Sequence, residues 1–266
     1  MSWEVYVRVI TVAGRKGGIK KTTTTVNTAY ELSQKGKRVL VIDFDGQGDA
    51  TSFYRRDKTE FFIADVLLER KFDVNKAIYP AMIKGVEQDN LFIIPARGGD
   101  VMSKLNMDMV SFPKREERLI RHLESVKDKF DFVLIDTSPE TSILSMNAVI
   151  AANEFIFPTT FTDRSFEGID VLIEHIQDAK FIDEEEIDYL ILPVGIDKRV
   201  KSTYDYGREY LAERFPHNVT QTTIWHRQSD FENAELDHLP VSVYKPSSPT
   251  AMYYKNFAKE VIDNEC

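Results

Sequence analysis

The chain has 266 residues, of which 42% are hydrophobic, and its formal net charge is −9. This composition supplies a large core, and the acidic balance argues against a wholly basic nucleic-acid-binding protein while leaving room for a local basic face. The sequence has no run of 18 or more apolar residues and no charged-then-apolar leader before its first predicted strand, so we expect a cytoplasmic protein.

Strand and helix patterns alternate along the chain. Residues 5–13 form a β-branched apolar run, as expected for a strand buried on both faces. Residues 22–35 follow with a helical pattern that stops near Gly36. Further strands are expected at 39–43, 91–95, 132–136, 155–158 and 189–194, and helices at 61–69, 115–127, 141–151, 166–180, 202–214 and 250–263. The alternation predicts an α/β fold, a doubly wound, mostly parallel sheet flanked by helices, in a single domain over residues 1–266.

The stretch from Gly14 to Thr23 is typical of a phosphate-binding loop. Glycines let the backbone N–H groups of such a loop point inward at phosphate oxygens. Lys21 would reach the β- and γ-phosphates, and the hydroxyl of Thr22 would bind Mg²⁺. We assign Gly14, Lys21 and Thr22 to the template G-x-x-x-x-G-K-[ST], in which Lys20 takes the place of the last glycine.

An early lysine makes this loop unusual. Lys16 is followed directly by Gly17 and Gly18, which gives the pattern K-G-G-x-x-K-[ST] of one subgroup of nucleotide-driven switches. The alternative is a glycine-rich turn in an ordinary βα unit. A strand precedes the loop and a helix follows it, so loop amides and the helix N-terminus would converge on an anion, and this context favours the phosphate site.

Two apolar strands end in aspartate. The strand at 39–43 ends at Asp43, with Asp45 and Gln47 close behind, and the strand at 132–136 ends at Asp136. Ligands of open α/β sheets bind at the carboxyl ends of the strands, so Asp136 would lie beside the Mg²⁺ shell. Asp43, Asp45 or Gln47 would orient an attacking water or contact that shell. A single strand-end aspartate is more often a turn or helix cap, but two such strands after a phosphate loop favour the catalytic interpretation.

Together these motifs resemble the ParA family of partition ATPases, within the wider ParA/MinD group, and the resemblance spans nearly the whole chain. The first strand begins near residue 5, so the resemblance is to the small type without an N-terminal helix-turn-helix. The matching segments are Lys16-Gly-Gly-x-x-Lys21-Thr22, Val39-Leu-Val-Ile-Asp43-Phe-Asp45-Gly-Gln47-Gly-Asp-Ala-Thr51, Phe132-Val-Leu-Ile-Asp136-Thr-Ser-Pro139, Phe157-Pro158-Thr159, Phe166-Glu167-Gly168, Ile196-Asp197-Lys198-Arg199, Lys245-Pro246-Ser247 and the helix from Ala251 to Phe257.

The resemblance implies an ATPase with a P-loop NTPase fold, a deviant Walker A loop, and ATP or ADP with Mg²⁺ as cofactors. Lys16 would reach the nucleotide of the partner subunit in an ATP-sandwich homodimer, Asp43 would position the hydrolytic water, and Asp136 would support the metal. Lys16, Asp43 and Lys21 would be catalytic, and Thr22, Asp43 and Asp136 would serve the metal. The implied nucleotide-binding residues are Gly14, Lys16, Gly17, Gly18, Ile19, Lys20, Lys21, Thr22, Thr23, Asp136 and Pro246.

The sequence departs from the family pattern at two positions. Lys20 replaces the usual glycine, and Gly46 replaces the usual proline before Gln47. A lysine keeps its backbone N–H for phosphate but adds a Cβ where the loop is tight. Retained binding with slow hydrolysis, altered dimerisation and lost nucleotide binding are the possible outcomes. We favour the first because the strand-end carboxylates and Thr22 are intact.

The resemblance also implies sequence-independent DNA binding by the ATP-bound form and a nucleoid-associated location. The matching basic residues are Lys198, Arg199, Lys201 and Arg227. Lysine and arginine need only reach the DNA phosphates, so no strict motif is expected, and an ordinary solvated surface is an equal alternative. A ParB-like centromere-binding adaptor would be the partner that stimulates hydrolysis.

Three other functions can be compared with this one. A MinD-like membrane-associated ATPase would need a basic amphipathic C-terminal helix, but residues 253–265 are mixed and end acidic, so we expect no membrane partner. An iron–sulfur carrier would need paired cysteines, and Cys266 is the single cysteine. A nucleotide-binding scaffold that does not hydrolyse ATP stays open because of Lys20.

Overall fold

The computed structural model describes residues 7–55, 59–140 and 142–264, and within them one sheet of eight strands has the order β3-β4-β2-β5-β1-β6-β7-β8. Neighbouring strands are parallel except for β3 and β4. The strands are β1 (Arg8–Val12), β2 (Val39–Asp43), β3 (Tyr79–Ile83), β4 (Val86–Ile94), β5 (Phe132–Asp136), β6 (Glu154–Thr159), β7 (Asp188–Ile196) and β8 (Ile224–Trp225). The sheet is wound outward on both sides of β1, so the predicted doubly wound, mostly parallel α/β fold is confirmed.

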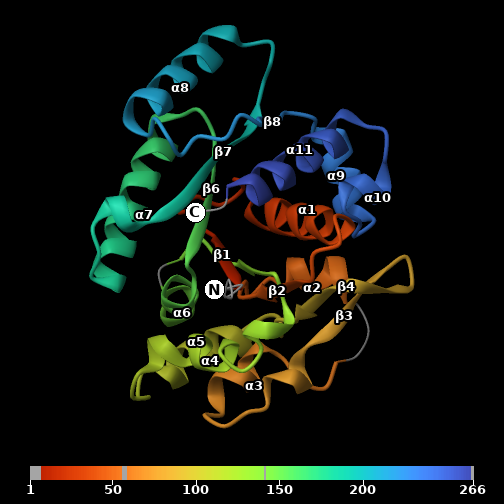
Figure 1. Cartoon of the computed structure of the whole chain (residues 1–266), viewed down its shortest axis with the longest axis vertical. Helices are drawn as coiled ribbons and strands as arrows, with labels where there is room; N and C mark the ends of the chain where they lie inside the picture. Colours follow the sequence, from red (N-terminus) through yellow and green to blue (C-terminus); the bar gives the residue numbers. More distant parts are fainter. Residues whose placement is uncertain (1–6, 56–58, 141, 265–266) are drawn as a thin grey trace, which may run out of the picture.

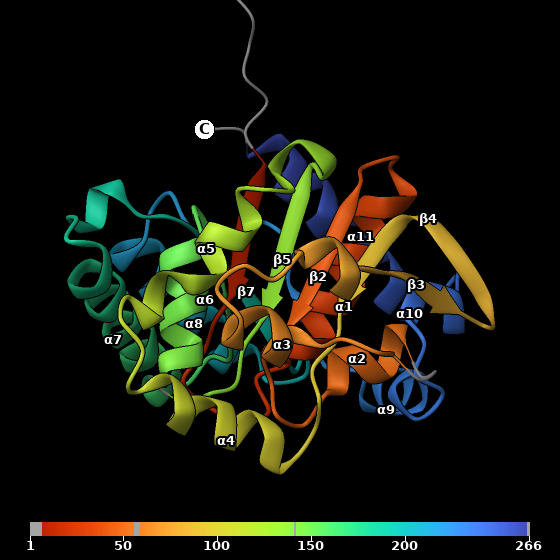
Figure 2. The same cartoon turned by 90° about the horizontal axis from the view of Figure 1, so that it is seen from below.

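Helices cover both faces of the sheet, with α1 and α9–α11 on one side and α3–α7 on the other (Figures 1 and 2). They are α1 (Lys21–Gln34), α2 (Asp49–Tyr54), α3 (Ile63–Leu68), α4 (Asp100–Met109), α5 (Arg118–Leu123), α6 (Ile143–Ala151), α7 (Asp163–Lys180), α8 (Lys201–Arg214), α9 (Gln228–Leu236), α10 (Val241–Tyr244) and α11 (Pro249–Asp263).

Alternation along the central strands divides the core into two layers. In β2, Val39 and Val41 pack with α1 and α11, whereas Leu40 and Ile42 pack with α3 to α6 on the opposite face. All five residues of β2 are buried, as expected for a parallel strand covered on both sides. The strand ends that carry Asp43 and Asp136 are therefore held by core packing on both faces.

The structure contains helices α2, α4, α9 and α10 and strand β8, which the sequence did not lead us to expect, and it differs from the predicted elements at two further places. We missed the hairpin β3–β4, whose turn at Lys84 and Gly85 has positive φ at both residues; the first half of β4 is polar and exposed, which hides the strand pattern. The helix predicted at 115–127 is broken: the buried Asn147 side chain donates to the Arg115 carbonyl (2.8 Å) and accepts from the Leu119 N–H (3.0 Å). A side chain thus takes hydrogen bonds that a continuous helix would make within itself.

The other predicted elements are confirmed within about two or three residues, where the structure describes them. Residues 5–6 of the first predicted strand, residue 141 of a predicted helix, and Cys266 lie outside the described residues. In α1, Val26, Ala29 and Leu32 are buried, and Tyr30 is partly buried at the edge of that face.

The order of the central strands brings the predicted site residues to one edge. β2, β5 and β1 are neighbours, and Asp43 is the register partner of Asp136. Val12, the last residue of β1, is also paired with Asp136. The phosphate loop after β1 and both aspartates therefore meet at the carboxyl edge of the sheet, the usual place for a ligand in this fold class.

Candidate functional site

The predicted phosphate loop lies between the end of β1 at Val12 and the start of α1 at Lys21. Gly18 has φ of +78°, a conformation that glycine adopts without steric cost. The first amides of α1 lack partners within the helix and carry the positive end of its dipole. The loop and helix start thus form a site suited to an anion.

Gly14 has a packing role in place of the template role that we assigned to it. Counting back from Lys21, the first glycine of the template falls on Arg15, one residue later. A Cβ on Gly14 would lie 2.1 Å from Cδ1 of Ile19. Because Ile19 is buried beneath the loop, a side chain at position 14 would require that isoleucine to move.

Lys21 and Thr22 begin α1 and point into the polar end of the sheet. Lys21 is 7% exposed. Burial lowers its pKa, and the negative charges of Asp136 and Asp45 act in the opposite direction. The hydroxyl of Thr22 donates a 2.7 Å hydrogen bond to Oδ2 of Asp136, whose Oδ1 accepts a weaker one from Thr25 (3.2 Å). Asp136 thereby fixes the first turn of α1 against β5.

Asp43 holds the segment that follows β2. Its Oδ2 accepts hydrogen bonds from the backbone N–H (2.8 Å) and the hydroxyl (2.7 Å) of Thr51, and its Oδ1 accepts one from the N–H of Asp45 (3.0 Å). Thr51 also accepts from the N–H of Ala96 at the end of β4 (2.9 Å). Asp43 therefore organises the loop between β2 and α2.

The adjacent carboxyl groups of Asp43 and Asp136 are both fully buried. Burial raises the pKa of Asp43 and of Asp136 well above the ordinary carboxyl range, and the charge of Asp43 raises that of Asp136 further. Burial disfavours the charged form of each carboxyl group, and a bound cation would favour it.

The donor atoms at this edge fit Mg²⁺. Among the described residues there is no group of three or more His, Cys, Asp or Glu side chains placed to hold a metal alone. Mg²⁺ prefers oxygen ligands and is commonly held by one or two carboxylates together with substrate phosphates. The Thr22 hydroxyl, which donates to Asp136 and keeps lone pairs, supplies such an oxygen beside the phosphate loop.

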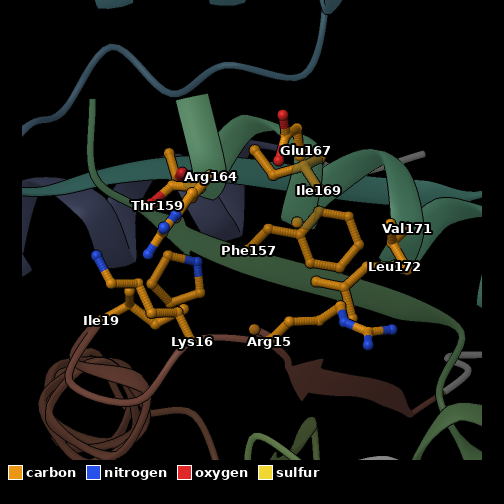
Figure 3. Close-up of a pocket in the computed structure, with 14 residues that line it drawn as sticks. Arg15, Lys16, Ile19, Phe157, Thr159, Arg164, Glu167, Ile169, Val171 and Leu172 are labelled. Atoms are coloured by element: carbon orange, nitrogen blue, oxygen red, sulfur yellow. The ribbon is translucent and has the colours of Figure 1, made fainter. Parts of the chain in front are cut away.

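Lys16 is exposed, in contrast to Lys21, and lines a pocket of about 460 Å³ beside the phosphate loop. Arg164, at the start of α7, also lines this pocket, and Figure 3 shows Lys16 and Arg164 reaching it from opposite sides. Arg15 extends in the opposite direction from Lys16 along the pocket (Figure 3). Two facing cations at one opening favour an anionic group between them.

Lys20 occupies the left-handed region, with φ of 60° and ψ of 36°. This conformation costs a non-glycine residue about 1–2 kcal/mol. The Lys20 ammonium lies 4.5 Å from the ring centroid of Phe231 on α9, and such a contact stabilises by about 0.5–2 kcal/mol. Burial lowers the pKa of Lys20, opposed by the charges of Glu235 and Glu232. The cost of the backbone conformation and the stabilisation by the contact with Phe231 are of similar size, so this contact can offset the strain of a lysine at position 20.

The remaining predicted nucleotide contacts surround the same loop. Gly17 is exposed, Thr23 is half-buried in the first turn of α1, and Pro246 is exposed in the turn between α10 and α11. α10 is joined to α1, because the N–H of Val241 donates to Oδ1 of Asn27 (2.7 Å).

The predicted DNA-binding residues follow β7 and β8. The Lys198 ammonium lies 4.5 Å from the Trp225 ring centroid, and Lys201 and Arg227 are exposed. Arg199 forms an ion pair with Asp197 (2.6 Å) that holds the pKa of that carboxyl well below its usual range. Its charge is thus offset locally, which sequence analysis did not anticipate.

The structure brings Lys21, Thr22, Asp43 and Asp136 together, whereas Lys16 is exposed and lines the neighbouring pocket. The roles assigned to all these residues stay predictions. Sequence analysis missed Arg164, whose only signal was a basic residue just before the predicted helix at 166–180. It also missed Thr51, the main hydrogen-bond partner of Asp43, although Thr51 stands within a quoted motif.

A family model, curated relatives and solved structures each match most of this chain. The AAA domain family (AAA_31) matches residues 7–189. The chain is 30% identical over 260 residues to the sporulation initiation inhibitor protein Soj of Bacillus subtilis, covering 97% of this chain and 99% of that protein. It is 28% identical to the chromosome-partitioning ATPase Soj of Treponema pallidum, covering 96% and 97%. A crystal structure of cobyrinic acid a,c-diamide synthase from Mycobacterium smegmatis, with bound ATP analog and magnesium, has a TM-score of 0.77 at 25% identity, covering 96% and 94%.

Proposed function

Because this chain belongs to the ParA family of partition ATPases, we propose that it is an ATP-dependent dimerising switch that positions plasmid or chromosomal DNA, or another large cargo, over the nucleoid. It is an ATPase of the positioning type. The proposal treats the chain as one ATPase domain. It further assigns ATP or ADP with Mg²⁺ as the bound species, in line with the ATP analog and magnesium in the related crystal structure.

This proposal rests on the different positions of two lysines of the phosphate loop, one buried and one exposed. Lys21 is buried beside Asp136, where it can bind phosphates within its own subunit. Lys16 is exposed on the outer side, facing a pocket that Arg164 also lines. A second phosphate-reaching lysine on the outside of the loop is useful when it extends to another subunit, in the manner of an arginine finger.

The proposed mechanism uses this chain's own groups in sequence. The loop amides and Lys21 bind the phosphates, and the Thr22 hydroxyl, held by Asp136, would hold Mg²⁺. When bound, the metal would supply neutralising charge at the phosphates. Asp43 orients the attacking water and accepts its proton as the water oxygen bonds to the γ-phosphorus. The bond from that phosphorus to the β–γ bridging oxygen breaks and ADP leaves, while Lys16 stabilises charge on the phosphates of the partner subunit. Dimerisation then depends on ATP, because the nucleotide is part of the contact.

Mg²⁺ with ADP should stabilise the protein more at pH 8.5 than at pH 6. The raised pKa values of Asp43 and Asp136 mean that the ligand-free fold loses stability as the pH rises through them. Mg²⁺ favours the charged carboxylates, so binding of Mg²⁺ with ADP should restore the stability that the ligand-free fold loses at high pH. We expect the ligand-induced rise in melting temperature to be about 2–4 °C larger at pH 8.5, which corresponds to about 1 kcal/mol.

Thermal melts with Mg²⁺–ADP at both pH values measure this effect. Asp136→Asn is the control, because it removes one of the titrating groups, and its pH difference should be smaller. An equal rise in melting temperature at the two pH values in the unmodified protein contradicts the assignment.

Charge reversal at Arg227 should weaken DNA binding by the ATP-loaded protein at least tenfold, since each phosphate contact contributes to affinity and to its salt dependence. Arg199→Glu should have a smaller effect, because Asp197 already offsets the Arg199 charge. Nucleotide affinity should not change in either variant. The measurement is retention of a random-sequence duplex across a salt series, with Arg70→Glu in the exposed turn after α3 as a surface control. DNA binding by Arg227→Glu equal to that of the unmodified protein would exclude this surface.

A ParB-like, centromere-binding adaptor that stimulates hydrolysis is part of the proposal. The test of the whole proposed function is the rate of ATP hydrolysis by the purified protein alone, with DNA, and with the DNA-binding protein encoded by a neighbouring gene. Saturable Mg²⁺–ATP binding with turnover that rises in the presence of the adaptor supports the switch. Binding without turnover in any condition supports the non-hydrolysing scaffold, and no saturable binding refutes both.

The membrane-associated alternative lacks a supporting observation. In the part of the chain that the structure describes, none of the helices has the length and apolar character that a membrane crossing needs. The apolar face of α11, which includes Tyr254, Phe257 and Val261, is buried against the sheet and α1. That face is therefore occupied within the fold, and we do not propose a membrane partner.

A further inference from the structure

One face of α1 is joined to the C-terminal part of the chain by a row of polar contacts, which we call the α1 seam: Lys20, Thr24, Asn27 and Glu31. Their spacing of four, three and four residues places them on one face of the helix. Lys20 contacts the Phe231 ring, Thr24 Oγ1 lies 3.4 Å from the Tyr254 hydroxyl, Asn27 accepts from the Val241 N–H, and Glu31 accepts from the Ser242 hydroxyl.

Lys20 is the member of the α1 seam that belongs to the phosphate loop itself. Its backbone adopts a conformation that glycine would take without strain. Its side chain is directed to α9, where the Phe231 ring and the charges of Glu232 and Glu235 favour an ammonium group. The lysine therefore contributes a contact to α9 that glycine at this position could not make.

Contacts of α9 extend to the Pro246 turn. Asp230 on α9 accepts a hydrogen bond from the ammonium of Lys245 (3.0 Å), the residue before Pro246. Phe231 also packs edge-to-face on Tyr254 of α11, with 6.3 Å between ring centroids. The phosphate loop, α9 and the Pro246 turn are thus connected through Lys20, Phe231 and Asp230.

We propose that Lys20 is a positioning residue: its ammonium on Phe231 fixes α9, and through Asp230 and Lys245 the Pro246 turn, relative to the phosphate loop. This rests on the proposed function, because the two segments are taken to be walls of one nucleotide site. A site whose walls are already fixed loses less conformational freedom when the ligand binds. Lys20 thus acts on nucleotide affinity without contacting the phosphates.

Hydrogen exchange of the ligand-free protein tests the contact itself. Lys20→Met keeps the length of the side chain and the backbone strain but removes the charge, whereas Lys20→Arg keeps the cation over the ring. We expect amides of residues 228–236 to exchange about five times faster in Lys20→Met and at the unmodified rate in Lys20→Arg. Unchanged exchange in Lys20→Met would overturn the proposal.

A double-mutant cycle with Phe231→Leu tests the effect on nucleotide affinity. By titration calorimetry with Mg²⁺–ADP, Lys20→Met should bind about five- to tenfold more weakly, and Lys20→Arg should bind as the unmodified protein does. In the Phe231→Leu background, adding Lys20→Met should cause no further loss, because the ring through which it acts is gone.

Each contrary result has a distinct meaning. Equal affinity of Lys20→Met and the unmodified protein would overturn the positioning role, and an undiminished loss in the Phe231→Leu background would show that Lys20 does not act through the ring and would also overturn it. If the unmodified protein itself binds no nucleotide, the proposed function fails, while the exchange experiment still decides whether Lys20 fixes α9.

Discussion

Replacing Lys16 with alanine is expected to abolish ATP-dependent dimerisation and to lower the hydrolysis rate about 10³-fold or more, the loss associated with removing a cation supplied across an interface. The affinity of the monomer for ADP should stay within about twofold, because Lys21 and the loop amides bind the phosphates within the subunit. Lys16 is exposed, whereas Lys21 is buried beside Asp136, so the removal of Lys16 should leave the buried part of the site unchanged.

The contrast with neighbouring cations makes this prediction specific. Arg15→Ala removes an adjacent exposed charge that extends in the opposite direction (Figure 3), and it should dimerise normally. Lys21→Ala removes the buried lysine and should lose nucleotide binding itself. Sedimentation with ATP and with ADP measures the oligomeric state of all three variants. A Lys16→Ala protein that still dimerises with ATP would contradict the proposed contact between subunits.

Arg164 extends the prediction to a second element. It lines the same pocket as Lys16 but comes from the start of α7 rather than from the loop. If the pocket receives an anionic group of the partner subunit, both cations contribute to the interface. The position of Arg164 follows from the winding of the chain, because β6 neighbours β1 and brings the start of α7 beside the loop. No local sequence signal contains that information.

The sequence predicted the central elements well because their signals are local. β2 and β5 are uninterrupted apolar runs that end in aspartate, and strands of this kind are buried on both faces. The meeting of Asp43 and Asp136 follows from parallel strands whose carboxyl ends share one edge. The phosphate loop was recognisable from its composition, although the register of Gly14 was misassigned by one residue.

What the sequence could not predict depends on distant partners. The break within 115–127 is caused by Asn147, a side chain from another helix. The pairing of Arg199 with Asp197 depends on side-chain conformation in an exposed turn. The contact of Lys20 with Phe231 joins residues more than 200 positions apart. In each case a tertiary contact decides what a residue does, and local propensity does not contain it.

Replacing Asp43 with asparagine is expected to lower hydrolysis by about 10²–10⁴-fold, the usual contribution of a positioned general base, with ADP affinity changed by less than about threefold. Asparagine keeps one side-chain oxygen, which can accept the two hydrogen bonds from Thr51, but it loses the negative charge and the oxygen that accepts from the N–H of Asp45. Thr51→Val is the matched control: it removes the 2.7 Å hydroxyl bond to Asp43 and leaves the carboxyl group in place. If Thr51→Val loses as much hydrolysis as Asp43→Asn, then Asp43 acts by holding the loop, and the base role is wrong.

Mixing the two inactive variants decides whether Lys16 acts between subunits. In a heterodimer of Lys16→Ala with Asp43→Asn, the nucleotide on the Lys16→Ala subunit has its own Asp43 and receives Lys16 from the partner. One of the two sites is then complete, so an equimolar mixture should recover hydrolysis that neither variant shows alone, up to about half of the unmodified rate if every dimer is a heterodimer and each site works independently. If Lys16 acted only within its own subunit, neither site would be complete and the mixture would stay inactive. Sedimentation of the mixture with ATP, with only the Lys16→Ala protein labelled, must show that the label is in dimers for this comparison to count, and an inactive mixture that contains these heterodimers would refute the exchange of Lys16 across the interface.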